Sequence, residues 1–426
     1  MFLFAFTRSA WHRSRATVVL FTLAALSTAT ILASCAAAPR DKHMSMAKPG
    51  TPIRLLPQGL GTYEWRVSTD ITEAQAFFNQ GMQLRWAYNM PESVASMVRA
   101  RELDPTCAMC FWGEAFSRGS FLNGGMSAEQ AAAARIAIQR ANQLKANSSA
   151  MERALIEAAS VRYPEDYDPD ERRLVDQAFA DAMAEVYADY PDNHDVATVY
   201  AVSLFLLEDR LGYRDLADPD LRRLHGVLNG VLTQDIKHPG ACHLYIHATE
   251  SSQQPELALA CADHLASTVP MASHIQHMPS HTWNEVGLWG RSVRANIAAN
   301  NADRRAAQGM GFSYGPTHNL HMLLFAASYD GQGAVATQAG KDYRKYADDA
   351  KFEATTLIRF GRFDEVLELD HRPDNSASAA IYDFAKGYAM LTSGDPAGAQ
   401  TTLTALREYV ATTDDKIRFH PAKNVV

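Results

Sequence analysis

The sequence lacks the short motifs of the commonest enzyme classes. It has no HExxH motif, which excludes the usual zincin arrangement, and it has neither the GxSxG motif of α/β-hydrolases nor a Walker loop. No segment alternates apolar and polar residues over the length of a strand, so a β-sheet is not expected. Helices are therefore the expected framework, and a functional site has to be built from residues outside these motifs.

Basic residues are also scarce. The chain has 40 lysines and arginines against 48 aspartates and glutamates, which gives a formal net charge of -8. An acidic protein repels the phosphate backbone and attracts cations. We therefore expect no nucleic acid as a partner.

The first residues predict a lipid-anchored protein. Arginines and no acidic residue precede an apolar run, residues 16–31, which is too short to be a comfortable membrane span. Residues 32–35, Leu-Ala-Ser-Cys, follow the run and resemble a lipobox, in which the cysteine is lipidated and becomes the new N-terminus. We predict a lipoprotein signal peptide over residues 1–34 and lipidation of Cys35. The alternatives are an uncleaved anchor and an ordinary signal peptide.

The residues after this cysteine indicate where the anchor lies. Ala36 stands where an aspartate would retain a lipoprotein in the inner membrane. In a Gram-negative cell we therefore expect a cell-envelope protein, held in the outer membrane by its lipid and facing the periplasm. Residues 35–60 are predicted to be a lipidated tether, because the stretch after the cysteine lacks periodicity and contains Pro, Lys and Ser.

The body of the chain is predicted to consist of paired helices. Glycine and proline lie between stretches rich in alanine, leucine, methionine, glutamate and glutamine. One unit, residues 77–105, has the spacing that resembles a tetratricopeptide repeat (TPR), through Gly81, Leu84, Ser93, Met97, Ala100 and Pro105. We predict an all-α, TPR-like α-solenoid of six to eight antiparallel helix pairs over residues 61–412, with a C-terminal tail over residues 413–426. The alternative is an irregular all-α domain.

Four cysteines lie in this body. Cys107 and Cys110 have CxxC spacing, but no βαβ pattern surrounds them, so we interpret them as small buried helix residues or a structural bridge rather than a redox centre. The expected compartment permits disulfides. The pairing of these two cysteines with Cys242 and Cys261 stays open.

The 15 histidines are unevenly distributed, because nine of them lie within residues 238–321. The first block begins at His238 and continues with His243, His247 and Glu250. The last three have the spacing i, i+4, i+7, which puts them on one face of a helix.

Two further blocks follow. The second block contains His274, His277 and His281, and the third contains His318 and His321. Pro279 would interrupt a continuous helix through the second block. We therefore expect a helix to begin near Met278, with the first two histidines in the preceding turn.

The three blocks predict one metal site. Each has a proline just ahead of a histidine, as is common in a first helical turn, and each falls where the first helix of a successive pair is expected. All three should then face one concave groove. The expected metal ligands are His238, His243, His247, Glu250, His274, His277, His281, His318 and His321.

This nitrogen-rich set suits a transition metal ion. Copper or zinc is favoured, and iron is allowed, although di-iron helical sites usually have more carboxylates. Glu250 would be either a ligand or the general base on a metal-bound water. The alternatives are a groove lined by histidines without metal and plain packing of the histidines in the core.

These residues resemble a family of bacterial TPR lipoproteins that carry histidine blocks. The matching stretches, between about Phe77 and Gly387, are residues 103–113, 238–250 and 277–287 and the block His318-Asn319 with His321. The resemblance implies the fold and the histidine site, and it assigns no reaction. One departure is Met90, which follows Asn89 where the family often has a histidine.

Two classes of function follow. The first is a metal site that performs chemistry as an oxidoreductase or hydrolase, with one metal ion or two, or that handles metal without catalysis. The second is a scaffold whose concave groove holds a protein or peptide partner, with metal structural or absent. A pure scaffold does not need eight histidines in register, so metal binding ranks first.

Overall fold

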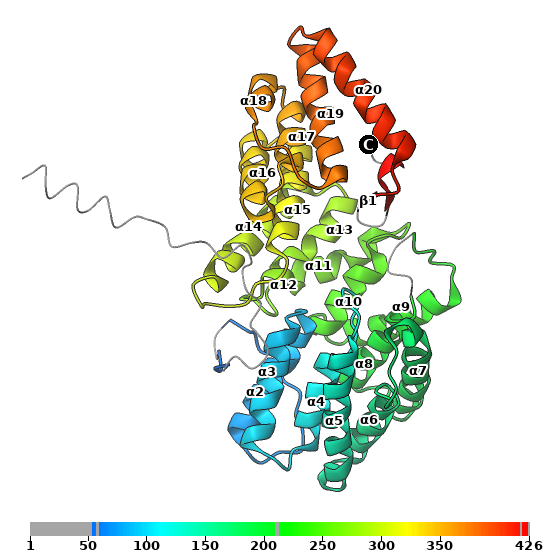
Figure 1. Cartoon of the computed structure of the whole chain (residues 1–426). Coiled ribbons are helices and arrows are strands. Elements are labelled where there is room, and N and C mark those ends of the chain that lie inside the picture. The colour runs from blue at the N-terminus through cyan, green and yellow to red at the C-terminus, as the bar shows by residue number, and fades with distance from the viewer. Residues whose placement is uncertain (1–52, 57–58, 209–212, 418–419, 425–426) are drawn as a thin grey trace, which may run out of the picture. The chain divides into compact units, whose positions relative to one another are not determined.

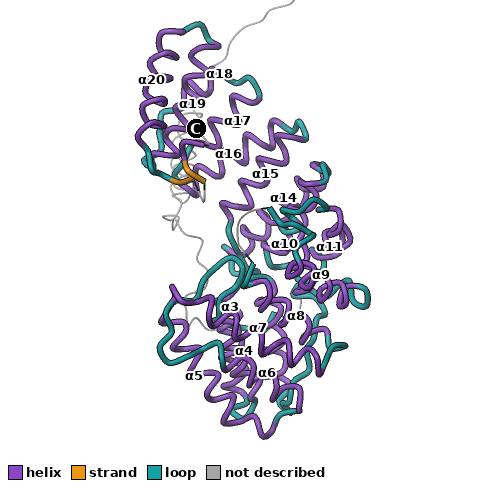
Figure 2. The backbone as a smooth tube through the Cα atoms, turned by 90° about the vertical axis from the view of Figure 1, so that its right-hand side faces the viewer, coloured by secondary structure: helices purple, strands orange, loops and turns teal. Residues whose placement is uncertain are grey.

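The computed structural model describes residues 53–56, 59–208, 213–417 and 420–424, and the predicted signal peptide and Cys35 lie outside them. Helix follows helix along the described chain, as the colour sequence of Figure 1 and the purple tube of Figure 2 show. The N-terminal helices are α2 (Thr72–Trp86), α3 (Met90–Leu103), α4 (Ala108–Arg118), α5 (Ala128–Leu144), α6 (Ala150–Ser160), α7 (Arg172–Asp189), α8 (His194–Phe205) and α9 (Pro219–Leu232). The all-α class predicted from the sequence is confirmed.

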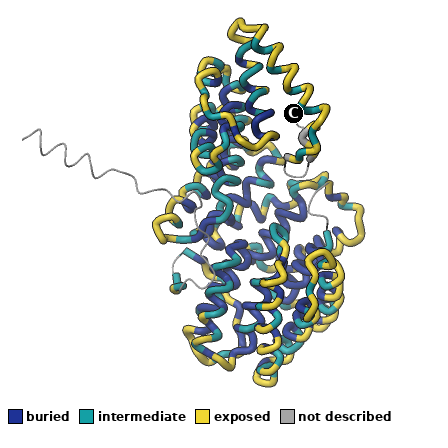
Figure 3. The backbone as a smooth tube through the Cα atoms, in the orientation of Figure 1, coloured by how far each residue is buried: buried dark blue, intermediate teal, exposed yellow. Residues whose placement is uncertain are grey.

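The histidine blocks lie on the helices that come next. The remaining helices are α10 (Pro239–Thr249), α11 (Leu259–Leu265), α12 (Ser273–His277), α13 (Pro279–Glu285), α14 (Trp289–Ala306), α15 (Pro316–Tyr329), α16 (Gly333–Ala347), α17 (Lys351–Arg359), α18 (Phe363–Glu368), α19 (Ser376–Thr392) and α20 (Pro396–Thr412). Helix α20 has no buried residue, in keeping with its yellow and teal tube in Figure 3. None of the described helices combines the length and the apolarity needed to cross a membrane.

Short elements connect and end the helices. The 3-10 turns are η2 (Lys145–Asn147), η3 (Pro169–Glu171), η4 (Pro255–Ala258) and η5 (Ala422–Asn424). The sequence predicts no strand, but the tail contains a two-residue antiparallel pair, β1 (Lys416–Ile417) with β2 (His420–Pro421). So short a pair leaves no alternating pattern to detect.

Successive helices pack against one another along the chain. Helix α2 contacts α3, α3 contacts α4, and the succession continues to α19 and α20, except that α11 contacts α13 across the short α12. The connections are often only a few residues long, which makes neighbouring helices antiparallel. The described chain is therefore a TPR-like α-solenoid, as predicted. Helix α2 also contacts α10, which brings the start of the domain onto the first histidine helix.

Small residues allow the first helices to approach closely. A Cβ atom at Gly81 of α2 would lie 2.6 Å from Cε of Met97, and one at Gly113 of α4 would lie 2.5 Å from its Sδ. The side chain of Met97, on α3, thus fills the space that two glycines leave on either side of it. This packing is the physical reason for the small residues of the predicted repeat.

Segments outside the helices also hold the domain together. Residues of the predicted tether contact it, because Gln80 of α2 bonds the backbone of Arg54 and Leu56, and Gly59 accepts a hydrogen bond from the amide of Met271. Disulfides join Cys107 to Cys110 and Cys242 to Cys261. The second bridge ties α10 to α11.

We predict that Gly113→Ala destabilises the protein while Gly226→Ala does not. The added methyl group at position 113 meets Met97, which cannot move toward Gly81, and such overpacking costs about 1–3 kcal/mol. Gly226 lies inside α9 with no neighbour within 4 Å, so alanine there should stabilise by about 0.5–1 kcal/mol. Urea unfolding of both variants measures the difference. Equal stabilities would contradict this account of the packing.

Candidate metal centre

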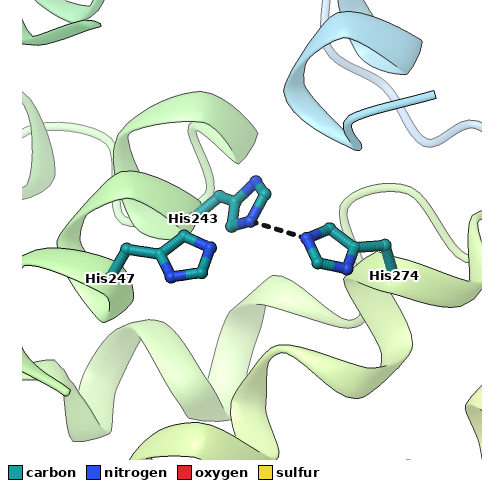
Figure 4. A group of neighbouring side chains, drawn as sticks. All are labelled: His243, His247 and His274. Carbon is teal, nitrogen blue, oxygen red and sulfur yellow. Dashed lines mark hydrogen bonds between the residues drawn. The ribbon is translucent and has the colours of Figure 1, made fainter. Parts of the chain in front are cut away.

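Three histidines from two helices form what we name the first triad: His243, His247 and His274. His243 and His247 lie one turn apart on α10, and His274 lies on α12. The Nε2 atoms of His243 and His274 are 3.1 Å apart, and one ring nitrogen from each residue lies within 4.8 Å of the others. Figure 4 shows the three rings gathered around a common point. Each residue is at most 3% exposed.

Three further histidines form the second triad: His277, His281 and His318. They come from α12, α13 and α15, and one ring nitrogen from each lies within 4.8 Å of the others. The Nε2 atoms of His277 and His281 are 2.9 Å apart, and the ring centroid of His318 is 4.6 Å from that of His277. His277 is buried, whereas the other two are half-buried.

Local sequence explains why these helices present their histidines together. Helices α10, α13 and α15 begin at Pro239, Pro279 and Pro316, as proline in a first turn predicts. The expectation that the histidines before Pro279 lie in a turn is wrong. They lie on α12, and Met278 keeps helical angles between α12 and α13, so no loop separates these two helices.

Glu250 joins the two triads. It is the C-cap of α10, and its Oε1 accepts a hydrogen bond from Nδ1 of His247 at 2.7 Å. Its Oε2 lies 2.5 Å from Nδ1 of His281. Both carboxylate oxygens thus face the outer nitrogens of imidazoles. The sequence predicts Glu250 as a ligand or general base, and in the structure the spacing i, i+3 lets its carboxylate reach Nδ1 of His247.

Oxygen acceptors lie behind two other rings as well. Nδ1 of His243 donates to the carbonyl oxygen of Trp86 at 2.6 Å, and Nδ1 of His277 donates to Oδ1 of Asn296 at 2.8 Å. The amide nitrogen of Asn296 donates to the carbonyl of Ser292, which fixes the orientation of this side chain. Metal-binding histidines usually donate their second N–H to such acceptors.

The charges of the site favour neutral histidines and one carboxylate. Burial is the main cause that lowers the pKa of His243, His274 and His277 well below the ordinary value, and positive charge on neighbouring histidines lowers it further. Burial alone would raise the pKa of Glu250. The charges of His281 and His247 and their hydrogen bonds outweigh burial and hold that pKa well below its usual range.

Two of the expected ligands do not join either triad. His238 is the N-cap of α10, where its Nδ1 accepts a hydrogen bond from the amide of Ala241 and its Nε2 lies 3.3 Å from Oδ1 of Asp195. It precedes the helix and therefore does not share the face of His243. The ring of His321 stacks on Phe352 of α17, with centroids 4.1 Å apart.

The expectation of an open groove also needs correction. The first triad is buried beneath the turn that follows α2, because α2 packs on α10. The second triad reaches solvent only in part, and the side chain of His281 is 19% exposed. The histidines therefore lie within the helix packing rather than along a concave surface.

Sequence reasoning missed several residues that position the site. Asn296 lies within α14 in a polar stretch that gives no signal of its role. Asp303 is buried, and its two oxygens accept hydrogen bonds from Ser313 and from Asn319, the residue after His318. Tyr88 lies directly before Asn89-Met90, where the chain departs from the pattern of the resembling family. This departure was the one feature of the sequence that drew attention to the segment.

No protein-family model and no curated protein matches the chain. Among solved structures, the chain is similar to "Crystal Structure of the Yeast Tom70", with 12% identity, a TM-score of 0.33, and coverage of 79% of this chain and 85% of that one. It is also similar to "Structure of Naa15/Naa10 bound to HypK-THB", with 12% identity, a TM-score of 0.24, and coverage of 80% of this chain and 59% of that one. At such TM-scores neither structure informs the function of this chain.

We predict that the metal-free protein loses stability as the pH falls from 7.5 to 5.5. The unfolded chain takes up protons on its histidines below about pH 6.5, whereas the folded chain resists protonation of His243, His274 and His277. Their contribution is present above about pH 6.5 and is lost as the pH falls, by about 1 kcal/mol for each residue at pH 5.5.

Urea unfolding with a chelator present, at both pH values, measures this loss. The variant His274→Asn should show a smaller loss, and His371→Asn, which alters an exposed histidine outside the triads, should behave like the unaltered protein. Identical unfolding free energies at the two pH values would contradict the burial of neutral histidines.

Proposed function

We propose that the chain binds two transition metal ions, one at each triad, with the Nε2 atoms of the histidines as ligands. His238 and His321 are left out of this ligand set. Glu250 orients His247 and His281 from behind and links the two sites. The proposal rests on residues from four helices that the fold brings to one place.

The contact between His277 and His281 carries the proposal. Nδ1 of each ring faces an oxygen that only accepts hydrogen bonds, the amide oxygen of Asn296 for His277 and the carboxylate of Glu250 for His281. When both rings are neutral, both Nδ1 atoms hold the proton, and both Nε2 atoms present lone pairs, 2.9 Å apart. Either a proton on His281, balanced by the carboxylate of Glu250, or a metal ion beside the two Nε2 atoms removes the repulsion between these lone pairs, and we propose the metal ion.

The spacing and the chemistry of the donors fit a metal ion. Nitrogens bound to one zinc ion at about 2.0–2.1 Å are about 3.3 Å apart in a tetrahedral shell, close to the 3.1 and 2.9 Å found in the two triads. Imidazole ligands suit copper and zinc, and the absence of carboxylate ligands among the described residues disfavours iron. Copper or zinc is therefore our first choice.

Such a centre would serve either catalysis or metal handling. A bound ion supplies Lewis acidity or, in the case of copper, electrons. Burial favours the neutral form of His243 and His277, and the oxygen acceptors behind these two rings fix their orientation. We propose two alternatives of equal rank. The protein is either a metal-dependent oxidoreductase or hydrolase, or a protein that handles metal without catalysis.

We predict two metal ions per chain after reconstitution of the full-length protein with copper or zinc and removal of the excess. His243→Ala should leave one ion, because it removes a ligand of the first triad, and His281→Ala should leave one, because it removes a ligand of the second. The double variant should bind none. Elemental analysis measures the content, and circular dichroism checks folding.

The control is His371→Ala, which removes an exposed histidine outside the triads and should retain both ions. His318→Ala, at a half-buried position, serves if His281→Ala fails to fold. The proposal fails if the unaltered chain binds less than one ion after reconstitution, or if the double variant binds as much as the unaltered chain.

We also predict that Glu250→Gln weakens metal binding without abolishing it. The amide can still accept one hydrogen bond but loses the negative charge behind the two rings, and loss of such an outer partner costs about 10–100-fold in affinity. Competition with a chelating dye gives the affinity of each ion. An unchanged affinity would contradict the orienting role of Glu250, and complete loss of one ion would make it a ligand.

The place of the protein in the cell is part of the proposal. We propose that Cys35 carries lipid and that the chain faces the periplasm from the outer membrane, as a member of the histidine-block TPR lipoproteins. The arginine-rich start and residues 32–35 support this location. Mass spectrometry of the mature N-terminus tests it, because lipidation starts the chain at residue 35 with an added diacylglycerol mass.

A protein- or peptide-binding scaffold is the second candidate, favoured by aromatic side chains on the surface. Phe325 and Tyr329 of α15 are 36% and 52% exposed, and the ring of Trp289 stacks on Tyr329 at 4.7 Å. Exposed apolar groups of this kind often mark interaction sites. Tyr329→Ala should leave the metal content unchanged, so partner binding and metal binding can be measured separately.

A further inference from the structure

The two triads differ in their access to solvent. All residues of the first triad are at most 3% exposed. In the second triad only His277 is fully buried, whereas the side chain of His281 is 19% exposed and His318 is half-buried. Glu250, between them, has a side chain that is 16% exposed. Small molecules dissolved in water therefore meet the second triad first.

Two tyrosine rings cover the first triad. The ring of Tyr88 lies 4.3 Å from that of His243 and stacks on those of His247 and His274 at 6.0 and 5.4 Å, all between centroids. The ring of Tyr314 lies 4.5 Å from that of His274. Aromatic rings thus occupy the space beside each imidazole of this triad.

The space beside His243 in this triad is small. A cavity of about 10 Å³ is lined by His243, Tyr88 and mostly apolar neighbours, among them Trp86, Phe121 and Phe205. A cavity of this size holds at most one water molecule. An additional ligand of several atoms has no room there.

The backbone that places Tyr88 has an unusual conformation. Tyr88 has φ +61°, a left-handed conformation that is strained for a non-glycine residue and that persists only where its surroundings impose it. The side chain of the next residue, Asn89, donates to the carbonyl of Ser313, which precedes Tyr314. This hydrogen bond ties the two covering rings to each other.

We propose that the exchangeable coordination position of the metal centre lies at the second triad alone, where a small anion binds, and that Tyr88 and Tyr314 close the first triad to exogenous ligands. The inference rests on the proposed binding of two metal ions, and it assigns a different role to each ion. A closed shell is typical of a structural or storage ion, and an open position is typical of an ion that reacts or is exchanged.

Azide binding to the copper-loaded, full-length chain tests the proposal. Azide bound to copper(II) gives a charge-transfer absorption band, and its titration counts the open positions. The unaltered chain should bind one azide for two copper ions. His318→Ala should lose the band and keep one copper ion, whereas His274→Ala should keep the band and one copper ion.

Variants of the covering ring give an independent reading. Tyr88→Gly removes the ring and relieves the left-handed backbone, so a second azide should bind, which doubles the stoichiometry. Tyr88→Phe keeps the ring and should bind one azide. These two variants decide the matter if His318→Ala loses both copper ions.

Each outcome is informative. Failure of the unaltered chain to bind copper refutes the proposed metal binding itself. If two copper ions bind, the inference is overturned by two azides on the unaltered chain, by no azide at all, by a band that survives His318→Ala but not His274→Ala, or by a single azide on Tyr88→Gly.

Discussion

The site depends on one constraint, which is that buried imidazoles turn their Nε2 atoms toward each other because their Nδ1 atoms are already committed to oxygen acceptors. Trp86, Asn296 and Glu250 supply these acceptors. Burial keeps several of the rings neutral, so the lone pairs are available. The metal ions that we propose would bind to these lone pairs.

The rest of the fold places the oxygen acceptors behind the histidine rings. The turn after α2 brings the carbonyl of Trp86 behind His243, and α14 brings Asn296 behind His277. These partners are 157 and 19 residues from their histidines along the chain. The stacking of helix pairs thus supplies both the histidines of the two triads and the groups that orient them, and Glu250 links the two triads.

Much of this structure could be predicted from the sequence, through its helical periodicity and the positions of its glycines and prolines. The all-α class followed from composition, and the starts of three histidine helices followed from their prolines. The spacing i, i+4 on α10 predicted that His243 and His247 share a face, because such spacing is a property of the helix alone.

Other features could not be read from the sequence because they depend on tertiary contacts. The orienting role of Glu250 depends on where α13 places His281, and the exclusion of His238 and His321 depends on Asp195 and Phe352, which are remote in sequence. The closure of the first triad depends on a single left-handed residue, which no local pattern announces.

The most direct test of the central claim is an anomalous difference map from crystals of the full-length chain grown with copper or zinc, measured on both sides of the metal absorption edge. The account predicts two peaks per chain, one about 2 Å from the Nε2 atoms of His243, His247 and His274 and one at a similar distance from those of His277, His281 and His318. A map with no peak among these six residues would contradict the proposed metal binding, whether metal ions are bound elsewhere on the chain or not at all.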